Sequence, residues 1–246
     1  MNSTQIIILA GGAGTRMQSE TPKVLALLHG KPLIMHLLES IKISGVCESP
    51  VIVVGKKREM VMEALGPDYA YAIQEQQLGT GHAVQVTESI LKGKAENIMV
   101  LYGDMPYISV ETIKKLSENH VIENNDITMA TAVLPDFDDW HSAFYNFGRI
   151  LRNAEGNVIG NVEFKDATDE QKEIKEVNPC YFVFKADWLW SHLDKLENKN
   201  NQSEYYLTDV VKMAVNEKAK FGSVKIDPKE ALGVNTRENL EFLHKI

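Results

Sequence analysis

Strand-like and helix-like segments alternate along the first 134 residues of the sequence. Short apolar runs typical of buried strands cover residues 5–10, 50–54, 69–73, 97–102 and 127–134. Segments with helical periodicity lie between them, at residues 32–43, 57–65, 81–91 and 110–120. This alternation predicts βαβ units and therefore an α/β fold with a mostly parallel, Rossmann-like sheet.

The pattern changes from about residue 135. Residues 135–146 are rich in acidic and aromatic side chains and have no clear periodicity. Short strand-like pieces then cover residues 148–152, 157–163 and 178–184, followed by helical segments at 186–196 and 207–217, a strand at 221–226 and a helix at 237–244. We interpret the short pieces as a small antiparallel excursion that forms a lid over the sheet. Because we find neither repeats nor a low-complexity linker, we expect one domain over residues 1–246.

Composition narrows the class of protein and its partners. The net charge of −8 argues against a nucleic-acid-binding surface but is compatible with a local cationic pocket for a small anion. Cys47 and Cys180 are the two cysteines, without a C-x-x-C motif, which is typical of a reducing cytoplasm. No run approaches the ~20 apolar residues of a membrane helix, and no signal segment precedes the first strand. We therefore expect a cytoplasmic protein with neither a nucleic-acid nor a membrane partner.

The first apolar run leads directly into a glycine-rich turn that contains Gly11, Gly12 and Gly14. Arg16 and Lys23 follow within a few residues. Glycines let backbone N–H groups approach phosphate oxygens, and the two cations would neutralise charge during phosphoryl or nucleotidyl transfer. The segment matches neither the dinucleotide fingerprint nor a Walker A loop, so the turn alone is equally compatible with a structural role.

A glutamine-rich segment precedes the helix predicted at residues 81–91. Gln74 and Gln77 carry amides that combine hydrogen-bond donors with an acceptor. This matches the edge of uracil or thymine, which combines carbonyl oxygens with one N–H. Gly79 and Thr80 open the helix, where backbone N–H groups are unpaired. The alternative is a polar loop with a glycine-containing helix start.

Polar side chains also follow the strand predicted at residues 97–102. Asp104 comes directly after Tyr102 and Gly103, at the carboxyl end of that strand, where ligands bind parallel sheets. A carboxylate there can hold Mg²⁺, which prefers one or two carboxylates together with phosphate oxygens. The alternative is an aspartate that caps the turn before Pro106. Asn235 offers a second oxygen ligand for Mg²⁺, or else the N-cap of the last helix.

The ordered set of motifs is more specific than any one of them. The segments L-A-G-G-A-G-T-R-M, Q-x-x-Q-L-G-T-G-H-A, L-Y-G-D-x-P, G-R-I, V-E-x-K-D-A, E-Y-Y-L-T-D and G-V-N-T-R occur in this order between about residues 5 and 240. Together they closely resemble the uridylyltransferase domain of bacterial UDP-N-acetylglucosamine pyrophosphorylases.

The resemblance implies a nucleotide-diphospho-sugar transferase fold. It implies that UTP and a sugar 1-phosphate, N-acetylglucosamine 1-phosphate in this family, react with Mg²⁺ to give a UDP-sugar and pyrophosphate. The attack on the α-phosphorus is in line and needs no protein nucleophile. The resemblance assigns the nucleotide to Leu9, Ala10, Gly11, Gly12, Gly14, Gln74, Gln77, Gly79, Thr80, Tyr102 and Gly103, the phosphates to Arg16 and Lys23, the metal to Asp104 and Asn235, and the sugar to Gly148, Glu163, Asn178, Tyr206 and Thr208.

The sequence departs from the family at three places. The family's short loop before G-R-I becomes a longer aromatic segment at residues 136–147, and its N-T-G becomes Asn178-Pro179-Cys180. Both changes bear on the choice of sugar. The sequence stops at Ile246 without the hexapeptide repeats of the family's acetyltransferase β-helix, so we expect no acetyltransferase activity, and the family's oligomeric state does not transfer. The alternatives are the same reaction on glucose, galactosamine or another hexose derivative, and a nucleotide-sugar-binding protein without catalysis.

Overall fold

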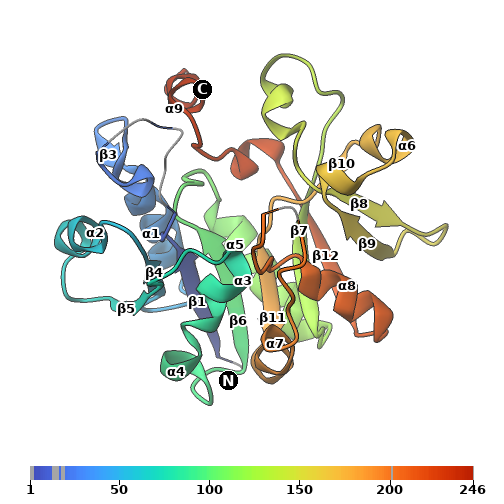
Figure 1. The fold of residues 1–246 in the computed structure, drawn as a ribbon, viewed down its shortest axis with the longest axis horizontal. Coiled ribbons are helices and arrows are strands. Elements are labelled where there is room, and N and C mark those ends of the chain that lie inside the picture. The colour runs from blue at the N-terminus through green and yellow to red at the C-terminus, as the bar shows by residue number, and fades with distance from the viewer. Residues whose placement is uncertain (1–2, 13–16, 18–19, 201, 246) are drawn as a thin grey trace.

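The computed structural model describes residues 3–12, 17, 20–200 and 202–245. Within these residues, ten strands form one mixed sheet in the order β5-β4-β1-β6-β11-β7-β10-β8-β9, with β12 also paired to β7 (Figure 1). The strands are β1 (Thr4–Leu9), β4 (Val51–Val54), β5 (Ala70–Ile73), β6 (Asn97–Tyr102), β7 (Ile127–Val133), β8 (Arg149–Arg152), β9 (Val158–Val162), β10 (Glu176–Val177), β11 (Phe182–Lys185) and β12 (Phe221–Ile226). A separate hairpin joins β2 (Leu27–Leu28) to β3 (Lys31–Pro32).

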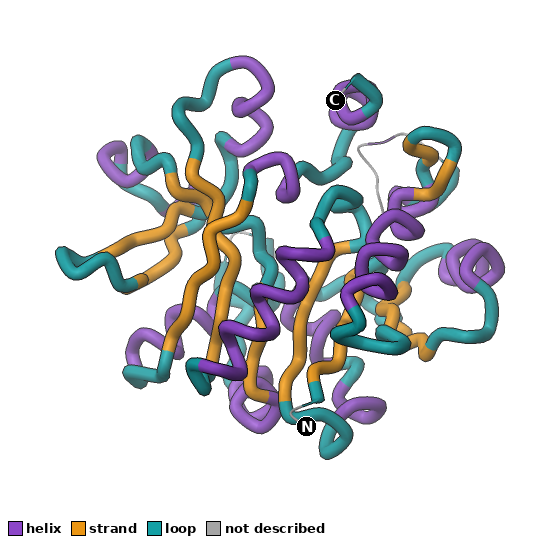
Figure 2. Tube along the Cα trace, turned by 180° about the vertical axis from the view of Figure 1, so that it is seen from behind, coloured by secondary structure: helices purple, strands orange, loops and turns teal. Residues whose placement is uncertain are grey.

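Helices cover both faces of the sheet, because side chains of the central strands alternate between two apolar clusters. In β1, Ile6 and Ile8 belong to one cluster and Ile7 to the other, and all three are fully buried. The first cluster includes α1 (Leu33–Ser44), α2 (Arg58–Leu65), α5 (Val110–Ile122) and α9 (Arg237–Leu243). The second includes α3 (Thr80–Gln85), α4 (Glu88–Leu91), α7 (Ala186–Leu193) and α8 (Asp209–Asn216). Figure 2 shows the long helices of the first face lying across the strands.

The parallel part of the sheet brings several strand ends to one edge. Strands β5, β4, β1 and β6 are mutually parallel, so the loops after β1 and β6 are neighbours. The N-terminus lies at the opposite edge (Figure 1). The predicted α/β class, with a mixed sheet and a small antiparallel excursion, is therefore confirmed.

Two details of the prediction for the second half are wrong. Residues 182–185 do not belong to the excursion, because β11 lies antiparallel between β6 and β7 in the middle of the sheet. Phe182, Val183 and Phe184 are all fully buried, as a strand covered on both faces requires. The excursion is not a lid, because β10 pairs with β7 and extends the main sheet through β8 and β9.

The helix predicted at residues 81–91 is two short helices in the structure. Helix α3 ends at Gln85 and α4 starts at Glu88. The Thr87 hydroxyl between them donates to the Val84 carbonyl at 2.7 Å. Threonine side chains that bond nearby carbonyls in this way compete with the continuous helical pattern.

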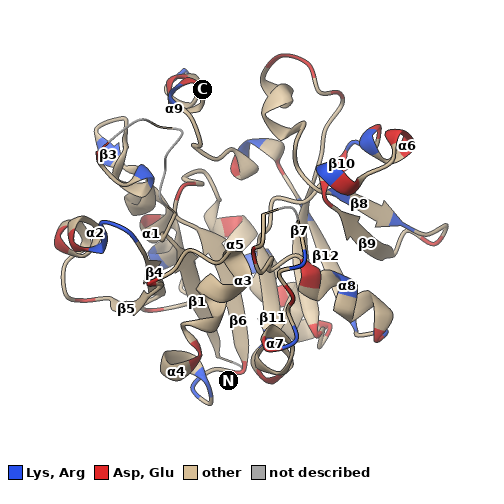
Figure 3. Cartoon of the chain, in the orientation of Figure 1, with Lys and Arg blue, Asp and Glu red and all other residues tan. Residues whose placement is uncertain are grey.

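The outer helices carry mixed charges. Figure 3 shows acidic and basic residues interspersed over α2, α6 (Asp169–Lys172) and α8. Within the part of the chain described here, no helix is both long and apolar enough to cross a membrane.

Candidate active site

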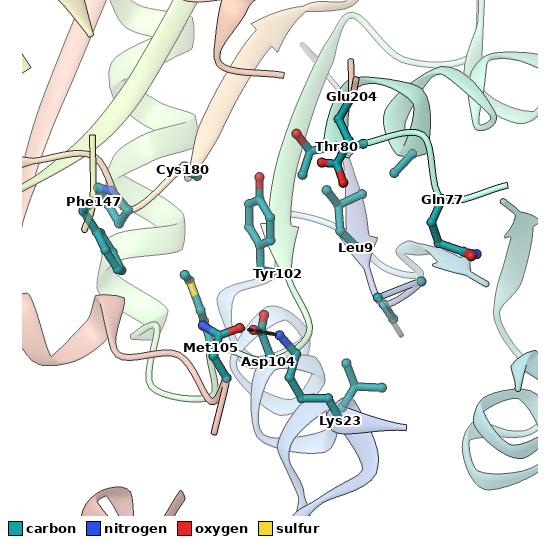
Figure 4. A pocket seen from close by; sticks show the side chains of 18 of the residues that line it. Leu9, Lys23, Gln77, Thr80, Tyr102, Asp104, Met105, Phe147, Cys180 and Glu204 are labelled. Carbon is teal, nitrogen blue, oxygen red and sulfur yellow. Dashed lines mark hydrogen bonds and ion pairs between the residues drawn. The ribbon is translucent and has the colours of Figure 1, made fainter. Parts of the chain in front are cut away.

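A cavity of about 570 Å³ opens at the carboxyl ends of β1 and β6 (Figure 4). It brings together residues that are far apart in the sequence. The predicted residues that line it are Leu9, Ala10, Gly11, Gly12, Lys23, Gln74, Gln77, Gly79, Thr80, Tyr102, Asp104, Gly148, Glu163, Asn178 and Asn235. Gly14 and Arg16 lie outside the described residues.

The remaining predicted residues lie close to this cavity. Gly103 lies between the lining residues Tyr102 and Asp104, and its N–H donates to the carbonyl of Leu9, another lining residue, at 3.0 Å. Tyr206 and Thr208 line an adjoining cavity of about 900 Å³. The two cavities share Tyr102, Glu163 and other lining residues, so they form neighbouring parts of one recess.

At one end of the cavity, the ammonium group of Lys23 lies between two side-chain oxygens. Lys23 comes from the short helix η2 (Lys23–Leu25), Asp104 follows β6, and Asn235 precedes α9. The Lys23 ammonium lies 2.5 Å from Asp104 Oδ2 and 2.9 Å from Asn235 Oδ1. Asp104 is only 7% exposed, so this interaction is shielded from water. Figure 4 shows Lys23 and Asp104 side by side at this end.

Asn235 is not the N-cap of the last helix, which was the alternative to a ligand role. Thr236 is the N-cap, and its hydroxyl accepts from the Asn239 N–H at 3.2 Å. The Asn235 side-chain oxygen instead accepts a hydrogen bond from the Lys23 ammonium.

The pair of Asp104 and Asn235 fits a hard divalent cation. Their oxygens already converge on one positive charge, the Lys23 ammonium. Among the described residues, no group of three or more His, Cys, Asp or Glu side chains could hold a metal. Asp104 and Asn235 would supply two oxygen ligands to a divalent ion, which would take its other ligands from phosphate or water.

A second wall is formed by the loop from Gln74 to Thr80. Gln74 is 4% exposed, and its Nε2 donates to the Gly79 carbonyl at 3.0 Å and lies 3.2 Å from His82 Nδ1. Gln77 Nε2 donates to the Gln74 carbonyl at 3.1 Å. The Gln74 amide nitrogen is thus used to shape the loop, so a contact with a base would come from its Oε1.

Backbone packing fixes this loop. Gly79 has a φ of 108°, and a Cβ there would lie 2.5 Å from the Tyr205 carbonyl oxygen. Gly55, after β4, is equally constrained, because a Cβ would lie 2.4 Å from the Gly11 carbonyl oxygen. Sequence reasoning missed Gly55, since a lone glycine after a strand has many explanations.

The opposite end of the cavity contains a buried amide, that of Asn178, whose nitrogen has no partner among the described residues. Asn178 is 2% exposed, and its Oδ1 accepts from the Cys180 N–H at 2.7 Å. Its Nδ2 has no hydrogen-bond partner among the described residues. A buried donor without a partner costs about 1–3 kcal/mol, so a ligand oxygen bound here would relieve that cost.

Gly148 closes the same end. Its carbonyl accepts from the Asn178 N–H at 2.9 Å, and a Cβ on Gly148 would lie 2.7 Å from Asn161 Oδ1. Asn161 Nδ2 in turn lies 3.3 Å from Glu163 Oε1. These contacts bring Gly148, Glu163 and Asn178 together at one end of the cavity.

Aromatic and thiol groups complete the cavity. Burial raises the pKa of Tyr102 well above its ordinary value, although a side-chain hydrogen bond with Thr80 opposes the shift. Burial also raises the pKa of Cys180, whose φ of 66° is a conformation that favours glycine. The Cys180 thiol therefore stays protonated at neutral pH and is a poor nucleophile.

The departures noted in the sequence lie at this end. Phe147, from the aromatic segment 136–147, lines the cavity together with Pro179 and Cys180. Figure 4 shows Phe147 and Cys180 across the cavity from Gln77, with Tyr102 between them. Met105 and Glu204 also line the cavity, and neither was predicted as a site residue, although Glu204 opens the E-Y-Y-L-T-D segment.

Comparisons with known proteins agree with this arrangement. A family model described as the MobA-like NTP transferase domain matches residues 6–203. The chain is 41% identical over 240 residues to the bifunctional protein GlmU of Caldanaerobacter subterraneus subsp. tengcongensis, covering 98% of the chain and 50% of that protein. It is 38% identical over 242 residues to the bifunctional protein GlmU of Desulfotalea psychrophila, covering 97% of the chain and 69% of that protein. The chain thus spans about half the length of most of these curated relatives.

A solved structure shares the fold. A crystal structure described as a glucose-1-phosphate thymidylyltransferase from Bacillus anthracis, in complex with sucrose, superposes with a TM-score of 0.78. The alignment covers 99% of this chain and 94% of that one at 18% sequence identity. At this identity the likeness supports the fold alone.

Proposed function

This chain belongs to the MobA-like NTP transferase family, and on that premise we propose that it transfers the uridylyl group of UTP to N-acetylglucosamine 1-phosphate. The products are UDP-N-acetylglucosamine and pyrophosphate. The single observation that carries the proposal is the cavity at the strand ends, which joins the Lys23–Asp104–Asn235 cluster to the Asn178 amide nitrogen, which has no partner among the described residues. The continuous sheet supports treating residues 1–246 as one catalytic domain.

The reaction needs no protein nucleophile. A phosphate oxygen of the sugar 1-phosphate attacks the α-phosphorus of UTP, the new P–O bond forms, and the bond to the bridging oxygen of pyrophosphate breaks. Lys23 and Arg16 neutralise the charge that grows on the α-phosphate and the leaving pyrophosphate, so catalysis is positioning and electrostatic stabilisation. The protonated Cys180 thiol at the sugar end is consistent with direct transfer.

Asp104 and Asn235 hold Mg²⁺ in this proposal. Their oxygens converge on one cationic position, which is the observation that supports the assignment. The metal ion, when bound, supplies positive charge to phosphate oxygens during transfer.

The other predicted residues divide between the two substrates. Leu9 to Gly12 and Gly14 line the nucleotide, and Tyr102 and Gly103 border its ribose. The nucleotide base lies against the loop that contains Gln74, Gln77, Gly79 and Thr80. Gly148, Glu163 and Asn178 bind the sugar, and Tyr206 and Thr208 line the adjoining recess that takes its 2-substituent.

A substrate panel tests the proposal. Purified protein with Mg²⁺ would be given each nucleoside triphosphate with a set of hexose 1-phosphates, and pyrophosphate release would be followed. We expect the highest kcat/KM for UTP with N-acetylglucosamine 1-phosphate. Equal or better turnover with glucose 1-phosphate would overturn the assigned sugar. Binding of a UDP-sugar without pyrophosphate release from any pair would instead identify a binding protein.

A further inference from the structure

Arg149 is a fully buried cation beside the sugar end of the cavity. It begins β8, directly after the cavity-lining residues Phe147 and Gly148, and its exposed fraction is 0%. The ion pairs of the described residues in this region join Arg152 to Glu176, Lys172 to Asp169 and Lys175 to Glu173, and none of them includes Arg149. A buried charge without a carboxylate is costly, so other contacts must stabilise it.

Three backbone carbonyls accept hydrogen bonds from the Arg149 guanidinium. Its Nη1 donates to the Phe147 carbonyl, its Nη2 to the Tyr145 carbonyl at 2.8 Å, and its Nε to the Lys172 carbonyl at 3.2 Å. A guanidinium presents its donors in a rigid planar fork, whereas a lysine ammonium is a compact point charge. Arginine is thus suited to hold three carbonyls from two segments of the chain.

Aromatic rings surround the same guanidinium. Its central carbon lies 4.5 Å from the centre of the Phe137 ring and 5.2 Å from that of Phe164. The Phe164 ring also contacts the Tyr145 ring, with centres 4.8 Å apart. Cations over aromatic faces are attracted by the ring quadrupole, and more strongly where water is excluded.

These contacts tie together two cavity-lining segments. The carbonyl of Phe147 belongs to the wall formed by Phe147 and Gly148, whereas Phe164 directly follows Glu163, which lines both cavities. Arg149 lines neither cavity itself. It therefore can affect a ligand only through the residues that it holds.

We propose that Arg149 is a positioning residue that fixes the Phe147–Gly148 wall relative to Glu163 and so sets the affinity for the sugar 1-phosphate. The inference deepens the proposed function and rests on it. It also explains how the aromatic segment 136–147, which the sequence flagged as a departure, takes part in the site: Phe137 and Tyr145 enclose the cation that orders the wall.

Steady-state kinetics of Arg149→Met and Arg149→Lys test the proposal. Arg152 provides the matched control, because it lies in the same strand, pairs with Glu176 and lines neither cavity. We expect Arg149→Met to raise the KM for the sugar 1-phosphate about tenfold or more, with kcat and the KM for UTP changed by less than about twofold. Arg149→Lys should be intermediate, and Arg152→Met should leave both KM values unchanged.

Hydrogen exchange of the substrate-free protein separates this inference from the proposed function. We expect Arg149→Lys to speed amide exchange in both residues 145–148 and residues 163–166. Arg152→Lys should speed exchange in neither of these two segments. If the wild type shows no turnover, the proposed function fails while this measurement still tests the coupling of the two segments.

Three results would overturn the proposal. An unchanged KM for the sugar 1-phosphate in Arg149→Met would do so, as would equal rises in the KM values for both substrates. Unchanged exchange in both segments of Arg149→Lys would also contradict it. If Arg149→Met does not fold, Phe137→Leu removes one ring while keeping the cation, and it should give the same selective rise in KM.

Discussion

The Lys23 ammonium lies between the side-chain oxygens of Asp104 and Asn235, the two metal ligands of the proposed function, so on that proposal Lys23 and the metal should compete in the absence of nucleotide. Its Nζ lies 2.5 Å from Asp104 Oδ2, and the two side chains are 17% and 10% exposed. A hydrogen bond between charged groups stabilises by about 1.5–3 kcal/mol, and that contact must be given up before a divalent ion can bind. Removing the ammonium with Lys23→Met should therefore increase the affinity of the nucleotide-free protein for Mg²⁺ by about ten- to a hundredfold.

Calorimetric titration with Mg²⁺ alone, or electron paramagnetic resonance with Mn²⁺, measures this affinity directly. Lys31→Met is the matched control. It also replaces one lysine by methionine, but Lys31 pairs with Glu39 at the surface. It should leave the affinity unchanged. When UTP is present the phosphates offer the ammonium another partner, so turnover of Lys23→Met should fall by about two orders of magnitude despite tighter metal binding. Metal affinity in Lys23→Met no higher than in the wild type would refute the reasoning.

Three further outcomes are expected. Asp104→Ala should lower the rate of pyrophosphate release by about two orders of magnitude or more, and a near wild-type rate would remove Asp104 from the mechanism. Gly148→Ala should lower the free energy of unfolding by about 1–3 kcal/mol in urea titrations, because its Cβ would lie 2.7 Å from Asn161 Oδ1. Gly160→Ala, where the nearest contact is an ordinary 3.4 Å, should cost far less, and equal costs would contradict the packing argument. Burial lowers the pKa of His120 to about 4, so the unfolded chain binds more protons between about pH 6.5 and 4. The free energy of unfolding should therefore fall as the pH is lowered through that window, and His120→Gln should flatten the dependence; a slope unchanged by the substitution would show that other groups cause it.

Sequence periodicity predicted the strands and helices whose limits depend on the residues of the segment itself. The strands at residues 97–102 and 221–226 begin and end as expected. The first is a buried apolar run, whereas the second includes Gly222, Ser223 and Lys225 and is only partly buried. A strand was predicted at residues 178–184 and one is found at Phe182–Lys185, but its assignment to the excursion was wrong, because an apolar run does not say which strands will flank it. Only the pairing with β6 and β7 shows that β11 is central and antiparallel.

Site residues were predictable from the sequence where a polar side chain directly follows a predicted strand. They were not predictable where their place depends on contacts with distant segments. Asp104 and Lys23 carried local signals, and the structure places them together. Asn235 and Thr236 are both good N-cap residues, so the sequence could not show which of them faces the cavity. The aromatic enclosure of Arg149 joins residues from three separate segments, a contact that no local pattern encodes.

The most direct test of the central claim follows both products of one reaction. Phosphorus NMR of the protein with Mg²⁺, UTP and N-acetylglucosamine 1-phosphate should show UDP-N-acetylglucosamine and pyrophosphate appearing in equal amounts, and neither product should appear when the sugar phosphate is left out. Loss of UTP without a nucleotide-sugar signal, or no change in either substrate, would contradict uridylyl transfer by this cavity.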